Sequence, residues 1–83
     1  MMSEKASHRV DRFIGQRLRQ QRETKNITQV DFANALCLPL RTIRRIEAGH
    51  ESIGALSLYE AAQIAEVPVS FFFEGYKTIK KTE

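Results

Sequence analysis

Apolar residues recur along the chain in short stretches with a helical period. In the first stretch they occupy positions i, i+3, i+4 and i+8, at Val10, Phe13, Ile14 and Leu18. This spacing predicts an amphipathic helix over residues 10–24 with its arginines on the outer arc. The polar residues 24–26 mark its end.

Two shorter helical signals follow, separated by a break that contains a proline. Thr28 fits an N-cap, with Asp31 three residues further on in a capping-box-like position. The buried stripe of this second helix would be Phe32, Ala33 and Leu36. Pro39 disfavours helical geometry in the residue before it but suits a first turn, so a third helix should begin at about this residue. Gly49 stands where a left-handed cap would end that helix.

The last helical stretch lies beyond a connection at residues 50–54. Its apolar positions, again at helical spacing, are Leu58, Ala61, Ala62 and Ala65. Ser57 and Glu60 would form a capping box at its start, and Pro68 interrupts the pattern before residues 70–74 add one or two turns closed by Gly75. Because no alternation long enough for a strand occurs, the pattern predicts an all-α fold, a compact bundle of four or five short helices.

The composition is that of one small soluble domain. The chain has 83 residues, of which 42% are hydrophobic and 28% charged, and it contains no apolar run long enough to cross a bilayer. We interpret residues 1–9 as a flexible leader, 10–76 as the folded domain and 77–83 as a polar tail. The first residues include acids and lack the apolar stretch of a secretory signal, so a cytoplasmic protein is expected.

Residues with reactive or metal-binding side chains are few. Cys37 is the only cysteine, and with His8 and His50 it offers too few ligands for a structural zinc site. The sequence lacks nucleophile-base pairing, metal-ligand spacing and a glycine-rich phosphate loop. We therefore expect neither an enzyme nor a bound cofactor or metal.

Charge is unevenly distributed along the chain, although the formal net charge of +3 decides little by itself. Residues 9–25 hold six basic side chains against two acids, and residues 46–76 hold five acids and no lysine or arginine. Between them stand Arg41, Arg44 and Arg45 with no acid among them. This polarity suits a polyanion approaching one side, but solvated faces that happen to differ in charge would give the same sequence.

The third predicted helix has two different faces. At about 100° per residue, Thr42, Ile43 and Ile46 gather on one side. The opposite arc holds Leu40, Arg41, Arg44, Arg45 and Ala48. A helix of this width fits the major groove of B-DNA, where an arginine can bond to guanine O6 and N7. An ordinary basic surface helix would show the same pattern.

The segments around these arginines resemble a known family. The pieces IGQRLRQQR, TQVDFANAL and TIRRIEAG, followed by VPVSFFFEG, stand in the order and spacing of phage-repressor and Cro-type helix-turn-helix domains. The resemblance covers about residues 10–76 and implies the fold of that family together with sequence-specific binding to double-stranded DNA.

Two residues depart from the family pattern. Gln21 replaces an apolar residue, and Cys37 stands where the turn usually has glycine. Because a non-glycine residue at positive φ is strained, the turn could be slightly rearranged, or Cys37 could be a buried small hydrophobe.

The resemblance also implies roles for individual residues. Gln29 would clamp a DNA phosphate at the start of the second helix, whose N-terminus Thr28 would cap, and Arg22 would form a salt bridge with Glu47. The implied base readers and groove neighbours are Arg41 and Arg45 as first choices, then Arg44, Leu40 and Thr42. Leu40 could contact a thymine methyl group or be buried at the helix junction. Further phosphate contacts are implied for His50 and Ser52, and Arg17 and Arg19 could add to them or simply be solvated.

One such domain covers about half of an operator, so a homodimer on a palindromic site is expected. Three consecutive phenylalanines cannot all enter one small core, and the candidates for the dimer interface are Phe71, Phe72, Phe73, Tyr76 and Ile79. The expected function is a transcriptional regulator, a repressor or autoregulator. The alternative is an antitoxin-like module that mainly grips a protein partner, with DNA binding secondary.

Overall fold

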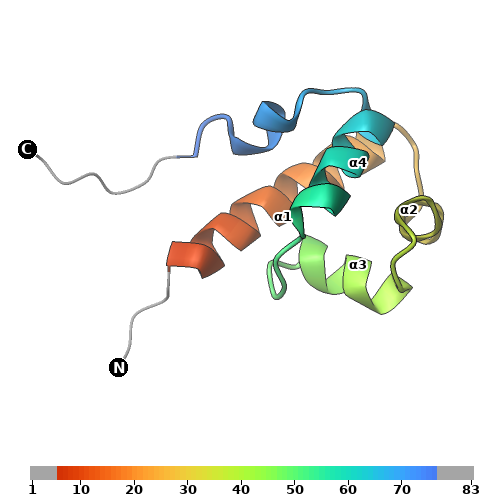
Figure 1. The fold of residues 1–83 in the computed structure, drawn as a ribbon, viewed down its shortest axis with the longest axis horizontal. Coiled ribbons are helices and arrows are strands. Elements are labelled where there is room, and N and C mark those ends of the chain that lie inside the picture. The colour runs from red at the N-terminus through yellow and green to blue at the C-terminus, as the bar shows by residue number, and fades with distance from the viewer. Residues whose placement is uncertain (1–5, 77–83) are drawn as a thin grey trace, which may run out of the picture.

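A long first helix, α1 (Ala6–Thr24), forms one side of the core, and four shorter elements follow it along the chain. They are α2 (Gln29–Leu36), α3 (Leu40–Glu47), α4 (Ala55–Ala65) and a 3-10 turn, η1 (Val69–Phe73). The computed structural model describes residues 6–76, with side chains from residue 9 onward. Figure 1 shows α3 below α1, α2 end-on beside it and η1 above. Within the described residues every regular element is helical, which confirms the all-α fold.

The core is built from the stripes that the sequence pattern predicts. Every helix contributes, with Ile14, Leu18, Phe32, Ala33, Leu36, Ile43, Ile46, Leu58, Ala61, Ala62, Ala65 and Phe72 buried. At about 25 cal/mol per Å² of apolar surface, this burial is the main stabilising contribution in so small a domain. Val10, at the N-terminal end of the first stripe, is only partly buried against the core.

Two predicted helix starts are wrong. Helix α1 begins at Ala6, so part of the expected leader of residues 1–9 is helical. Helix α4 begins at Ala55 with Gly54 as its N-cap and without a side-chain cap bond, which removes the predicted capping box of Ser57 and Glu60. Ser57 already lies in the first helical turn, because the Leu58 N–H donates to the Gly54 carbonyl at 2.9 Å. The expected tail of residues 77–83 lies outside the described residues.

The turn between α2 and α3 keeps the left-handed residue that the family pattern places there. Cys37 has φ 57° and ψ 39°, and the Leu38 N–H donates to the Ala33 carbonyl at 2.9 Å across it. Cys37 is exposed, so neither the rearranged turn nor the buried hydrophobe is found. At the other end of α2 the Thr28 hydroxyl accepts the Asp31 N–H at 3.0 Å, as the pattern predicts.

Arg17 attaches the C-terminal segment to α1. Its guanidinium donates to the carbonyls of Phe71 at 2.8 Å and Glu74 at 2.6 Å. The same group lies 5.2 Å from the ring centroid of Phe13 and 4.9 Å from that of Phe71. This attachment holds Phe72, which is 0% exposed, over the core.

A second tie joins the ends of α1 and α4. The ammonium group of Lys25 donates to the Glu66 carboxylate at 2.6 Å and thereby lowers the pKa of that carboxyl below its ordinary value. Among the described helices, none is both long and apolar enough to cross a membrane.

Candidate nucleic-acid interface

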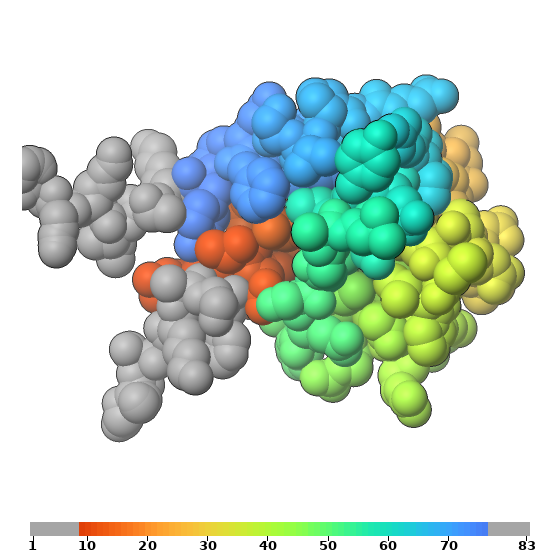
Figure 2. All heavy atoms as spheres, viewed as in Figure 1, coloured from red at the N-terminus to blue at the C-terminus, as the bar shows by residue number. Residues whose placement is uncertain are grey.

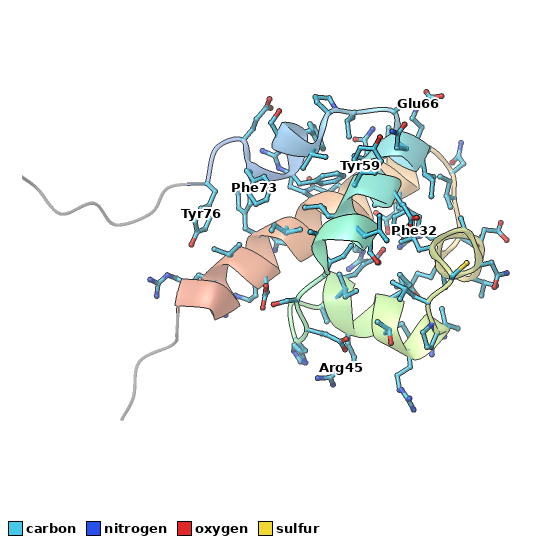
Figure 3. The ribbon with its side chains drawn as sticks, viewed as in Figure 1. Phe32, Arg45, Tyr59, Glu66, Phe73 and Tyr76 are labelled. Atoms are coloured by element: carbon cyan, nitrogen blue, oxygen red, sulfur yellow. The ribbon has the colours of Figure 1, made fainter. Side chains whose placement is uncertain are left out.

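The outer face of α3 carries the three arginines. Ile43, Ile46 and Glu47 are buried, whereas Arg41, Arg44 and Arg45 are exposed on the other side. The split follows from the helical period, because the buried residues are spaced by three or one and the exposed ones fall between them. Figure 3 shows Arg45 at the lower edge of the molecule, where α3 borders solvent. Three of the eight residues of α3 are therefore exposed arginines.

The three guanidiniums are not held alike. Arg45 donates from Nε to Oε1 of Glu51 at 3.1 Å and from Nη2 to the carbonyl of His50 at 3.2 Å. Arg41 and Arg44 make no hydrogen bond or ion pair with any residue that the structure describes. Arg45 is therefore oriented before any ligand arrives, while the other two can swing.

An open groove adjoins this face at the N-terminus of α2. It is lined by Arg19, Arg22, Thr28, Gln29, Val30, Leu40 and Arg44. The first backbone N–H groups of a helix have no acceptor within it and carry partial positive charge. With three arginines around such an N-terminus, the groove is suited to an anion of the size of a phosphate.

A buried ion pair fixes the wall of this groove. Arg22 donates to Glu47 from Nε at 2.7 Å and from Nη2 at 3.0 Å, and each residue is 8% exposed. Arg22 Nη1 also reaches the carbonyl of Ile27 at 2.8 Å. The Gln29 amide donates to Oε1 of the same Glu47 at 3.0 Å. Glu47 thus joins α1 to α3 and orients the amide at the start of α2, whose second N–H remains for a ligand.

Other residues assigned to phosphate from the sequence are placed differently. The Arg17 guanidinium donates to carbonyls of the C-terminal segment, which gives this arginine a structural role. The Ser52 hydroxyl lies 2.7 Å from both carboxylate oxygens of Asp11, so an acid stands beside it. Arg19 lines the groove and pairs with Glu23 at 3.1 Å. His50 is exposed beside the end of α3, while Thr42 and Leu40 are partly buried.

The phenylalanine cluster also needs correction. Phe72 is fully buried and cannot contact a second copy, whereas Phe73 is 43% exposed. Phe71 covers Arg17, and the Tyr76 ring is tilted against the Phe13 ring with 5.2 Å between their centroids. In a 3-10 turn successive residues point about 120° apart, so one of three enters the core. Ile79 lies outside the described residues.

The sequence pattern did not single out two exposed or surface-paired residues near the end of α3 and the start of α4, Glu51 and Leu56. Leu56 is 70% exposed at the start of α4, and its position off the stripe of Leu58 and Ala61 was the available signal. Glu51 has no comparable signal, because its pairing with Arg45 depends on how the loop after α3 turns back.

Known proteins match the chain along most of its described length. A family model described as helix-turn-helix matches residues 18–72. The chain is 35% identical over 66 residues to an uncharacterized transcriptional regulator in the ATPase CF(0) region of Rhodospirillum rubrum, covering 80% of this chain and 61% of that protein. It is 34% identical over 65 residues to the uncharacterized HTH-type transcriptional regulator y4wC of Sinorhizobium fredii, covering 78% and 46% respectively. A third relative, an uncharacterized HTH-type transcriptional regulator of Sinorhizobium medicae, is 33% identical over 72 residues, covering 87% and 52%.

The chain therefore spans between 46% and 61% of the length of these relatives. The matched residues include α2, the turn at Cys37 and α3, which are the helices and turn described above. The chain belongs to the helix-turn-helix family, of the phage-repressor and Cro type.

Proposed function

We propose that the chain is a sequence-specific regulator of transcription that places α3 in the major groove of double-stranded DNA. The observation that carries the proposal is the exposed row of Arg41, Arg44 and Arg45, which adjoins the basic groove at the N-terminus of α2. A helix fits the major groove, and an adjacent helix N-terminus can accept a backbone phosphate at the same time. The names of the related regulators support the same function.

The contacts divide between base reading and phosphate binding. Arg44 lines the groove together with Gln29 and Arg19, so these three face the phosphate. Arg41 and Arg45 lie on the outer face away from that groove and read bases, with His50 at the rim. Leu40 lines the groove and contributes an apolar contact beside the readers. Thr42 lies next to the readers on α3, at the edge of the DNA major groove.

The test separates the two kinds of contact by salt dependence. A phosphate ligand contributes about one unit to the slope of log K against log salt, whereas a base reader changes which sequence is preferred. Arg44→Ala should weaken binding to all duplexes and reduce the slope, and Arg41→Ala should relax the sequence preference. The control is Gln63→Ala, an exposed position on α4 away from this face, matched to Gln29→Ala. Equal effects of Gln29→Ala and Gln63→Ala would contradict a phosphate contact at Gln29.

We further propose that the regulator is a homodimer on a palindromic operator and acts as a repressor or autoregulator. Leu56 and Phe73 expose apolar surface beside a pocket of about 320 Å³. The pocket is lined mostly by apolar side chains, together with Asp11, Glu51 and Ser52 at its polar part; the apolar ones are Val10, Ile14, Ile46, Ile53, Ala55, Leu58 and Phe73. Figure 2 shows α1 in orange between the blue η1 segment and the green start of α4, where this pocket opens. Under two-fold symmetry, a projecting Leu56 of each copy faces the pocket of the other.

Sedimentation tests the dimer. Leu56→Glu should give monomers, because the new carboxylate would lose its hydration in the pocket and would meet the carboxylates of Asp11 and Glu51 there. Val30→Glu, at an exposed valine on α2, is the control and should leave the association state unchanged. A wild-type chain that is monomeric at all concentrations would contradict the homodimer. It would favour the antitoxin-like function, in which this surface binds a different protein.

A further inference from the structure

Arg45 is bound along one edge of its guanidinium and open along the other. Nε and Nη2 point to the same side of the planar group, and these are the two atoms engaged by Glu51 and by the His50 carbonyl. Of the five N–H bonds of the group, the two of Nη1 and the second of Nη2 remain. The end of the side chain therefore presents two parallel donors.

We propose that Glu51 is a positioning residue that aims the free Nη1 and Nη2 edge of Arg45 at a guanine. The inference rests on the proposed function and deepens it by naming Arg45 as the main specificity determinant of α3. Two parallel donors match the O6 and N7 acceptors of guanine in the major groove. Because the other edge stays on Glu51 and His50, reading the base requires no release of the pair.

The same pair keeps Arg45 away from phosphate. A carboxylate next to the guanidinium neutralises its charge locally and repels the DNA backbone. Arg41 and Arg44, without such partners among the described residues, retain full charge and mobility. Glu51 therefore lowers the affinity for arbitrary DNA while it raises the affinity for a sequence with guanine at the right position.

The Arg45–Glu51 pair is exposed, so its main effect should be to orient the Arg45 side chain rather than to stabilise the fold. The side chain of Arg45 is 52% exposed and that of Glu51 41%, and such surface pairs contribute little to folding stability. Removing Glu51 should therefore leave unfolding unchanged while it changes DNA binding, and sedimentation of the variant checks that its association state is that of wild type. A purely structural role would move the unfolding transition.

The experiment compares two duplexes of equal length, one selected from a random pool by the wild-type protein and one unrelated. Glu51→Ala should weaken binding to the selected duplex about fivefold while binding to the unrelated duplex stays equal or tightens. Glu51→Gln, whose amide oxygen can still accept from Nε, should lie between. In an Arg45→Ala background, Glu51→Ala should have no further effect on the preference for the selected duplex.

The control is Glu60→Ala, which removes the same charge from α4, a helix away from this face. If Glu51→Ala and Glu60→Ala both raise the affinity for the two duplexes by the same factor, Glu51 acts through net charge. That result would overturn the proposal. A wild-type protein that selects no duplex would instead refute the proposed function itself, and the positioning role with it. The two failures are thus distinguishable before any variant is compared.

Discussion

Gly15 of α1 packs directly on the carbonyl oxygen of Ile46 in α3, without room for a side chain between them. A Cβ at residue 15 would overlap that oxygen and lie 3.1 Å from the carbonyl oxygen of Glu47. The contact is between backbone atoms of two helices, so no side-chain rotation can relieve it. The absence of a Cβ at residue 15 thus sets the distance between α1 and the helix that presents the arginines.

Gly15→Ala should destabilise the fold by about 1 to 3 kcal/mol, because overpacking outweighs the roughly 1 kcal/mol that alanine gains in helix propensity. The matched control is Gly54→Ala, where a Cβ meets nothing within 4 Å. There the weaker N-cap and the reduced entropy of the unfolded chain oppose each other, so stability should stay within about 0.5 kcal/mol. Urea unfolding measures both, and equal effects would show that the helices can separate freely.

The buried pair of Arg22 and Glu47 should be costly to break from one side only. Arg22→Met leaves the carboxylate buried and unpaired and should cost about 3 to 5 kcal/mol. Adding Glu47→Leu should recover much of this loss in urea unfolding. The double variant should still bind DNA more weakly than wild type, because Gln29 has lost the acceptor that orients its amide. Full recovery of DNA affinity with stability would show that Gln29 needs no such orientation.

Replacing Cys37 by glycine should stabilise the fold. Its φ of 57° is strained for any residue with a Cβ, and its exposed side chain adds little packing. Cys37→Gly should be more stable than Cys37→Ala by about 0.5 to 1 kcal/mol, measured by thermal or urea unfolding. A glycine variant less stable than the alanine variant would mean that the positive φ at residue 37 does not strain a residue with a Cβ.

Arg17 distinguishes a structural from a DNA-binding arginine. Arg17→Met loses the bonds to the carbonyls of Phe71 and Glu74 and should cost about 1 to 3 kcal/mol of stability. Arg17→Lys keeps the charge but not the two-pronged donor geometry, so it should be destabilised as well. At a temperature where both variants are folded, the salt dependence of DNA binding should equal that of wild type. A reduced slope in Arg17→Met would restore the phosphate contact expected from the sequence.

The parts of this molecule that follow local rules were predictable. The apolar stripes of α1 and α2, the cap at Thr28 and the stop at Gly49 each depend on residues within one or two turns. The outward arc of α3 follows from the helical period alone, so the exposure of Arg41 could be foreseen.

Apart from the starts of α1 and α4, the differences from the sequence-based expectations concern contacts between distant parts of the chain. Arg17 donates hydrogen bonds to carbonyl groups that are 54 and 57 positions away in the chain, and no local sequence pattern predicts such contacts. The burial of Phe72 rather than Phe73 depends on a 3-10 turn, whose period differs from that of an α-helix. The sequence suggested that Ser52 contacts phosphate, and it gave no sign that the fold brings Asp11, 41 positions earlier, next to the Ser52 hydroxyl.

The central claim is that α3 reads a DNA sequence through its arginines. Its most direct test is to select from a pool of random duplexes at near-physiological salt, with wild type and with an Arg41→Ala, Arg45→Ala double variant, and to sequence what is retained. The account predicts an enriched palindromic motif with wild type that disappears with the variant. Retention that is uniform across sequences and falls steeply with salt would show that only phosphates are bound, and would contradict the account.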